Sequence, residues 1–140
     1  MGLDDGLWQH MRDAPIFLPV EKKGRDHWVE WIRDPSRYTL LALVGHEPVA
    51  FLSLGPANED VSTIILDEGT TSIYGAFTRQ DARGRGIAAV LLDRALGRAR
   101  DQGYVRCAVD FESANLDGAR FWLRHFRPVC LSLFRQITCP

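Results

Sequence analysis

The sequence predicts one mixed α/β domain, built on a mainly antiparallel, twisted sheet with helices on both of its faces. Helical patterns open the chain, β-rich segments separated by short turns follow, and a strand, helix, strand pattern fills the second half. At 140 residues, with 46% hydrophobic and 25% charged side chains, the chain is large enough to bury one core. We therefore expect a single domain over residues 1–140.

Four segments carry apolar residues at the spacing of an amphipathic helix. They cover residues 3–12, 25–33, 87–100 and 115–124. Pro15 and Pro35 limit the first two, and Gly103 follows the third as a helix stop. Residues 1–37 are therefore expected to form a helical N-terminal part that precedes the first predicted strand.

Six segments are rich in β-branched and apolar residues and are bounded by turn residues, as strands are. They cover residues 38–44, 49–54, 60–67, 71–78, 104–111 and 129–138. Short turns join the first strand to the second and the third to the fourth, which predicts two antiparallel hairpins. The fifth strand follows the third helix, which predicts a crossover connection.

The composition argues against several classes of function. A formal net charge of −1 gives no overall attraction for nucleic acid or for an anionic membrane. Cys107, Cys130 and Cys139 form neither an even-numbered disulfide framework nor a paired zinc motif. No apolar run reaches the roughly 20 residues of a membrane helix, and the start lacks the order of a signal peptide. We expect a cytoplasmic protein with no metal, no membrane and no nucleic-acid partner.

A glycine-rich loop between the fourth predicted strand and the third predicted helix carries the main functional signal. Helix N-termini offer unpaired N–H groups and a partial positive charge, and small residues let an anionic phosphate approach them. Gly84, Gly86 and Ala88 suit that approach, and Arg83 and Arg85 add positive charge beside the amides. The pattern therefore predicts a phosphate-binding site.

Three other interpretations of this loop are open. The glycines are also compatible with a simple turn, with the arginines as a solvated face. The dinucleotide fingerprint matches Gly84, Gly86 and Ala89, with Asp110 on a later strand, but residues 79–83 separate the first glycine from the strand, and antiparallel hairpins precede it. A nucleic-acid surface is the weakest interpretation. It would use Arg79, Arg83, Arg85, Arg94 and Arg98.

Two motifs together resemble the GNAT acetyltransferase family. Residues 83–88, Arg-Gly-Arg-Gly-Ile-Ala, match the family signature Arg/Gln-x-x-Gly-x-Gly/Ala. Residues 115–129, which begin Asn-Leu-Asp-Gly-Ala-Arg-Phe-Trp, are similar to the family segment Asn-x-x-Ala-x-x-Phe-Tyr that leads into Gly-Phe-x-x-Val. The matched region spans residues 72–129. The resemblance implies a GNAT fold and acetyl-CoA as the co-substrate.

The resemblance also implies which residues hold the acyl-CoA. The end of the strand before the loop would pair with the pantetheine arm, because the family splays this strand from the next one. The loop amides would cradle the pyrophosphate, and the second motif would complete the site. The residues concerned are Ala76, Phe77, Thr78, Arg83, Gly84, Arg85, Gly86, Ile87, Ala88, Ala89, Asn115 and Trp122.

The catalytic groups are less well marked. Many family members have a tyrosine, proposed to protonate the leaving thiolate, where this chain has Trp122, and an indole N–H cannot do so near neutral pH. Packing beneath the cofactor is the other role open to Trp122. Tyr74, Asp110 and Glu112 are candidate general bases, although the two carboxylates are also compatible with solvated or capping roles. Cys107 fits a small buried residue better than a nucleophile.

The start of the chain also departs from the family, whose members normally open with a β-strand before the first helix. Either residues 16–19 replace that strand or the chain is a shortened domain. A second copy would cover a missing sheet edge, and Trp8, Trp28 and Trp31 are expected near it. We therefore expect a homodimer.

The sequence thus predicts an N-acetyltransferase that moves an acetyl group from acetyl-CoA to an amine of a small molecule or peptide by direct attack. The alternative is a non-catalytic acyl-CoA-binding or sensing module of the same fold. The first two helices and residues 58–70 would face the acceptor. Acidic side chains there would favour a cationic amine. They are Glu59, Asp60, Asp67 and Glu68.

Overall fold

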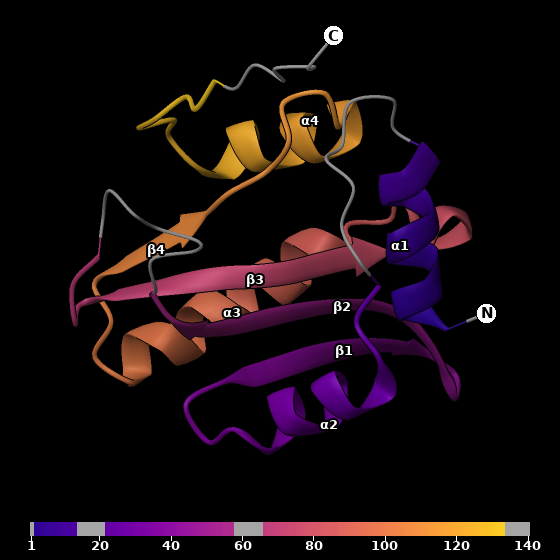
Figure 1. Cartoon of the computed structure of the whole chain (residues 1–140), viewed down its shortest axis with the longest axis horizontal. Coiled ribbons are helices and arrows are strands. Elements are labelled where there is room, and N and C mark those ends of the chain that lie inside the picture. The colour runs from indigo at the N-terminus through magenta and orange to yellow at the C-terminus, as the bar shows by residue number, and fades with distance from the viewer. Residues whose placement is uncertain (1, 14–21, 58–65, 134–140) are drawn as a thin grey trace, which may run out of the picture.

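The computed structural model describes residues 2–13, 22–57 and 66–133. Figure 1 shows a central sheet with helices in front of it, behind it and above it. The elements in chain order are α1 (Leu3–Asp13), α2 (Arg25–Arg33), β1 (Tyr38–Val44), β2 (Glu47–Pro56), β3 (Thr70–Thr78), the 3₁₀ turn η1 (Gln80–Ala82), α3 (Ile87–Asp101), β4 (Arg106–Val109) and α4 (Leu116–His125). All four predicted helices are confirmed, and their ends agree to within one residue.

The described strands form one mixed sheet in the order β1-β2-β3-β4. β1 pairs with β2, and β2 with β3, in antiparallel orientation, whereas β3 and β4 are parallel. Helix α3 makes the crossover between the two parallel strands, because strands that run in the same direction need a long connection. The predicted mixed, mainly antiparallel sheet is confirmed.

Helix α3 packs against one face of the sheet and forms the core with it. Leu52 and Leu54 of β2 are 1% and 0% exposed, and Leu92 and Ala95 of α3 meet them in the same cluster. Trp122 of α4 also belongs to this cluster. Since burying one leucine side chain contributes about 1.5–3 kcal/mol, these contacts fix α3 firmly relative to the strands.

Helices α1 and α2 cover the other face of the sheet (Figure 1). On α1, Gly6 approaches β3 so closely that a Cβ there would lie 2.8 Å from the ring of Phe77. On α2, the buried Trp31 ring packs edge-on against the Tyr74 ring of β3, with 4.9 Å between centroids. Helices therefore lie on both faces, as predicted. Trp31 covers an inner strand, however, and not the sheet edge where we expected it.

Two predicted strands differ from the structure. The strand expected at residues 104–111 is shorter, since only Arg106–Val109 form β4. The strand expected at residues 129–138 is wrong for its described part, where Val129 and Leu133 are 69% and 86% exposed and no strand forms. Alternating apolar residues form a strand only beside a partner edge, and a local pattern does not supply that edge.

Two further predictions fall wholly or mostly outside the described residues. These are the possible opening strand at residues 16–19 and most of the strand at residues 60–67. The described end of the second segment, Leu66 and Asp67, is not in a strand. The antiparallel partner of β3 is β2.

Candidate functional site

Strands β3 and β4 pair over a short distance and then separate. Residues 70–73 pair with residues 106–109, where β4 ends, while β3 continues to Thr78. Figure 1 shows the two strands diverging toward their carboxyl ends. On the side away from β2, no described strand pairs with residues 75–78. We call residues 74–78, with residues 110–112 after β4, the β3–β4 fork; its strand edge at residues 75–78 is open to an extended partner.

The fork begins at a β-bulge. Ser53 pairs with Gly75 and Leu54 pairs with Ile73, so Tyr74 is an extra residue in β3. An extra residue bends its strand and increases the local twist. The bulge therefore accounts physically for the divergence that the family resemblance implied.

The loop beyond the fork leads directly into the N-terminus of α3. Gly84 and Gly86 have φ angles of 72° and 78°, and a Cβ at either position would have no heavy atom within 4 Å. Glycine is favoured there because of the left-handed backbone, and the space beside the loop is open. Gly86 caps α3 without a side-chain hydrogen bond, and the first turn carries no acidic residue. The first N–H groups of α3 are thus suited to an anion, which is the fit that a pyrophosphate requires.

Arg83 is held by other parts of the protein. Its Nε donates to the Thr78 carbonyl oxygen at 3.0 Å, and its Nη1 donates to Asp117 Oδ2 at 3.0 Å. These bonds tie the loop to the end of β3 and to the first turn of α4. The ion pair with Asp117 compensates part of the Arg83 charge. The expected contact of Arg83 with a phosphate stays a prediction.

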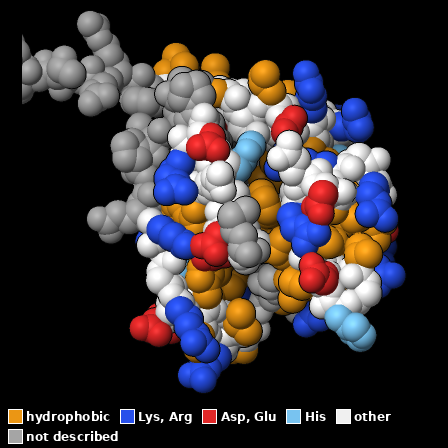
Figure 2. Space-filling view, turned by 90° about the vertical axis from the view of Figure 1, so that its right-hand side faces the viewer, with side chains coloured by type: hydrophobic (Ala, Val, Ile, Leu, Met, Phe, Trp, Pro, Cys, Tyr) orange, Lys and Arg blue, Asp and Glu red, His pale blue; other side chains and the backbone are white. Residues whose placement is uncertain are grey.

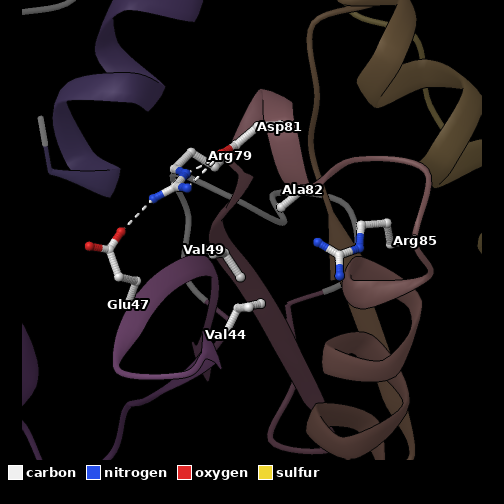
Figure 3. A pocket seen from close by; sticks show the side chains of 7 residues that line it. All are labelled: Val44, Glu47, Val49, Arg79, Asp81, Ala82 and Arg85. Atoms are coloured by element: carbon white, nitrogen blue, oxygen red, sulfur yellow. Dashed lines mark hydrogen bonds and ion pairs between the residues drawn. The ribbon is translucent and has the colours of Figure 1, made fainter.

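Arg85 borders a cavity of about 320 Å³ beside the loop (Figure 3). Val44, Val49 and Ala82 form the apolar part of its lining. The Arg85 side chain is exposed and makes no ion pair with any described residue. It is therefore the best-placed cation for a phosphate bound at this loop.

A cluster of ion pairs lies across the cavity from Arg85 (Figure 3). Arg79 donates through Nε and Nη2 to Asp81, at 2.8 and 2.5 Å, and through Nη1 to Glu47 at 3.1 Å. The hydrogen bonds between Arg79 and Asp81 are the largest cause of two pKa shifts. They raise the pKa of Arg79 and lower the pKa of Asp81. The donors of Arg79 are thus engaged within the protein, which leaves Arg85 as the cation facing the cavity.

Asn115 links α4 to α1. Its Oδ1 accepts from the Gly118 N–H at 3.1 Å, which caps α4, and lies 3.2 Å from His10 Nε2. Since this oxygen accepts from Gly118, His10 Nε2 must be the donor. Both bonds fix the orientation of the Asn115 amide. His10 was missed by sequence reasoning because nothing local pairs it with a residue 105 positions away.

Trp122 lies in the core. It is 8% exposed, and its ring packs against Phe121 and Phe126 at centroid distances of 4.9 and 5.7 Å. This placement favours the packing role over contact with a leaving group.

Tyr74 and Asp110 lie at the point where the fork opens. They directly follow Ile73 and Val109, the last pair that joins β3 to β4. The Tyr74 hydroxyl donates to the Pro56 carbonyl oxygen at 2.6 Å, which holds the phenol over β2. Glu112 lies farther along, exposed, and its main-chain oxygen accepts from the Asn115 N–H at 2.9 Å.

Asp110 has the most suitable electrostatics of the three candidate bases. The residue as a whole is exposed, yet the atoms around its carboxyl group displace enough water to raise its pKa above the ordinary value of 3.8. A raised pKa makes a carboxylate a stronger base. Tyr74, by contrast, is engaged by its hydroxyl in a bond to the main chain.

Cys107 has the character of a buried structural thiol. Burial raises its pKa to about 12, so the thiolate is scarce at neutral pH. In the described parts of the chain, no group of three or more potential metal ligands comes together. No helix there is long and apolar enough to cross a membrane.

The end of the molecule that carries α1 and the loop has mixed charge. Figure 2 shows Lys and Arg side chains interspersed with Asp and Glu, with hydrophobic atoms visible between them. The ion pairs of Arg79 and Arg83 with carboxylates are part of this pattern. On this face the described basic side chains therefore alternate with acidic ones and form no continuous basic patch.

Comparison with known families gives one match over most of the chain. Residues 5–126 match the model of the acetyltransferase (GNAT) family. A comparison with curated protein sequences finds no match.

Several solved structures have a similar fold and a distant sequence. A ribosomal-protein-alanine N-acetyltransferase from Brucella melitensis superposes with a TM-score of 0.69 at 16% identity, covering 97% of this chain and 89% of that one. A transcriptional regulator from Bacillus halodurans gives 0.67 at 21% identity, covering 96% and 93%. An aminoglycoside N-acetyltransferase in complex with CoA gives 0.68 at 15% identity, covering 99% and 97%. At these identities the likeness establishes the shared fold.

Proposed function

Because the chain belongs to the acetyltransferase (GNAT) family, we propose that it binds acetyl-CoA at the β3–β4 fork and transfers the acetyl group to an amine. The observation that carries this proposal is the arrangement of the fork and the loop. The edge of β3 at residues 75–78, with which no described strand pairs, leads to the N-terminus of α3 at Gly86, which has no side-chain cap. An extended, amide-containing arm and an anionic end group suit these two features respectively.

Each part of the site has a separate proposed contact with acetyl-CoA. The backbone at residues 74–78 pairs with the pantetheine arm, and the amides at residues 84–89 bind the pyrophosphate with Arg85 beside them. Thr78 and Asp117 hold Arg83 and thereby the loop. Since the phosphates lie at the open end of the fork, the thioester lies near its apex, beside Tyr74 and Asp110.

The reaction we propose is direct attack. The amine nitrogen forms a bond to the thioester carbonyl carbon, the carbon–sulfur bond breaks, the amine loses a proton and the thiolate gains one. Asp110 is our candidate for accepting the proton, directly or through water. The buried indole of Trp122 is no proton donor at neutral pH, so the thiolate takes its proton from another group or from solvent.

A small-molecule or peptide amine is the proposed acceptor. One similar structure is an aminoglycoside N-acetyltransferase in complex with a bisubstrate analogue. In that analogue CoA is linked to acetylneamine. Of the acidic residues expected to favour a cation, Asp67 is already engaged by Thr70, Gly69 and Arg106. Glu59 and Asp60 lie outside the described residues, so among described positions Glu68 is left for that role.

A non-catalytic acyl-CoA-binding module is the second candidate function. The observation that favours it is the burial of Trp122 at the position where many family members carry a tyrosine. Both candidates require acyl-CoA binding, and only the first requires thiol release.

Matched glycine variants test the binding step. Gly84→Ala and Gly86→Ala place a methyl group in the loop, whereas Gly103→Ala places one at the other end of α3, where φ is 93°. All three incur strain of about 1–2 kcal/mol, so their melting temperatures fall by similar amounts. We expect only the two loop variants to weaken acetyl-CoA binding in isothermal titration calorimetry.

If wild-type protein fails to bind acetyl-CoA, the proposed function is wrong. If it binds but releases no thiol with polyamines, aminoglycosides, amino acids or peptides, the sensing module becomes the better description. Equal weakening by Gly103→Ala would show that the loop has no special role.

We also propose a cytoplasmic, single-domain protein that forms a homodimer. The described sheet ends at β1, where Leu41 and Leu43 are 59% and 58% exposed. A second copy would cover this apolar edge. Sedimentation velocity at micromolar concentration is expected to give a dimer, and a monomer alone would contradict this.

A further inference from the structure

Arg37 lies against two aromatic rings that also contact each other, on the face that α2 covers. Its guanidinium carbon lies 4.0 Å from the centroid of the Trp31 ring and 5.3 Å from that of the Tyr74 ring. A Cβ at Gly55 would lie 2.9 Å from Arg37 Cγ, so a glycine in β2 leaves the space in which the arginine lies. The side chain is 28% exposed. It is therefore a partly buried cation whose stem and guanidinium contact the protein.

Only one edge of this guanidinium is engaged by the protein. Arg37 Nε lies 3.2 Å from Asp34 Oδ2. The other oxygen of Asp34 accepts from the Ser36 N–H and hydroxyl at 2.9 and 2.6 Å, which fixes the carboxylate. Neither terminal nitrogen of Arg37 has an acceptor within the described chain. Two parallel N–H donors at a fixed position are the geometry that a carboxylate binds in bidentate fashion.

Trp31 covers one face of the Arg37 guanidinium. Its ring is buried, at 9% exposed, and the guanidinium carbon lies over it. Because the terminal N–H groups of Arg37 have no acceptor among the described residues, they favour an anionic oxygen ligand over a cation.

This cluster lies next to the proposed reaction centre. Tyr74, whose ring contacts both Trp31 and Arg37, is the bulge residue at which the fork opens. The phosphate loop lies at the far end of the fork, so an acceptor reaches the thioester from the side of Tyr74. Arg37 is thus placed to hold the end of an acceptor remote from its reacting amine.

We propose that Arg37 binds a carboxylate of the acceptor, so that the acceptor is an amino acid or a similar small molecule with both an amine and a carboxylate. The inference rests on the proposed transferase function and narrows its substrate class. Arg37 acts on specificity and leaves the chemistry of the thioester untouched.

Matched acceptor pairs test this inference. Acetyl-CoA turnover is measured with the common amino acids, β-alanine and γ-aminobutyrate, each beside its own carboxamide, which keeps the amine and loses the negative charge. For the best acceptor, wild-type protein is expected to show a kcat/KM about 10- to 100-fold higher for the acid, as a charged hydrogen-bonded pair implies. Arg37→Gln is expected to remove this preference by raising the KM of the acid. Arg37→Lys, which keeps the charge and lacks the planar guanidinium, is expected to weaken the preference.

Arg33→Gln, an exposed change at the end of α2, is the control and keeps the preference. Acetyl-CoA affinity, measured separately, stays unchanged in all three variants and shows that they are folded. The inference is overturned if carboxamides react as well as acids, if the preference survives Arg37→Gln, or if no amino acid reacts although acetyl-CoA binds. Failure of wild-type protein to bind acetyl-CoA overturns the proposed function, and this inference with it.

Discussion

At the level of single residues, Asp110 combines a position at the fork apex with a perturbed acidity. Its pKa is raised because neighbouring atoms desolvate the carboxylate. In the folded protein the neutral form is therefore favoured relative to the unfolded chain. The contribution of this group to stability is greatest below its unfolded pKa and falls as pH rises through its higher folded pKa.

Asp110→Asn is expected to stabilise the protein at pH 7, where the wild-type carboxylate is charged, and to have less effect near pH 4. Melting temperatures at the two pH values measure this difference. Asp93→Asn, on the exposed surface of α3, is the control. If Asp110 is also the base, the variant loses kcat together with the acidic limb of the pH profile; an unchanged profile would remove it from the mechanism.

At the level of elements, α1 spans both sides of the fork. Gly6 lies against Phe77 of β3, and His10 bonds to Asn115, the cap of α4. Helix α1 thus joins β3, the strand proposed to pair with pantetheine, to α4, the helix that follows β4. Its position depends on contacts with residues far along the chain.

His10→Ala is expected to raise the acetyl-CoA dissociation constant by about 2- to 10-fold, because one hydrogen bond that orients Asn115 is lost. The measurement is a double-mutant cycle with Asn115→Ala, read by calorimetry. The two effects should be less than additive, since both act through the same amide. Gln9→Ala, exposed on the same helix, serves as the control. Strict additivity would show that His10 does not act through Asn115.

The elements also show how far sequence reasoning reaches. The four helices and strands β1 to β3 follow from local periodicity and were predicted with nearly correct ends. The bulge at Tyr74 depends on the register between β3 and β2, and the ion pair of Arg83 depends on the distant Asp117. Neither feature could be predicted from the neighbouring sequence. The glycine loop was predictable because the positive φ angles that it needs are signalled by its own glycines, Gly84 and Gly86. The prediction of a final strand was wrong for its described part, because no described strand edge lies beside these residues to pair with them.

At the level of the whole molecule, three distant parts of the chain meet at one site. β3 and the loop supply the proposed cofactor contacts, Asp110 directly follows β4, and the N-terminal region supplies α1, α2 and Arg37 (Figure 1). α3 lies behind the sheet and carries the helix N-terminus on a well-packed core. The proposed cofactor site therefore rests on the packed core of α3 and the sheet. The opposite face, which α1 and α2 cover, is available for contacts that select the acceptor.

The central claim is that acetyl-CoA occupies the β3–β4 fork and the loop at α3. Amide hydrogen exchange, followed by mass spectrometry with and without acetyl-CoA, tests it most directly. The account predicts slower exchange at residues 74–78 and 84–89, because these amides gain hydrogen-bond partners or lose access to water. Binding that slows exchange elsewhere and leaves both segments unchanged would contradict it.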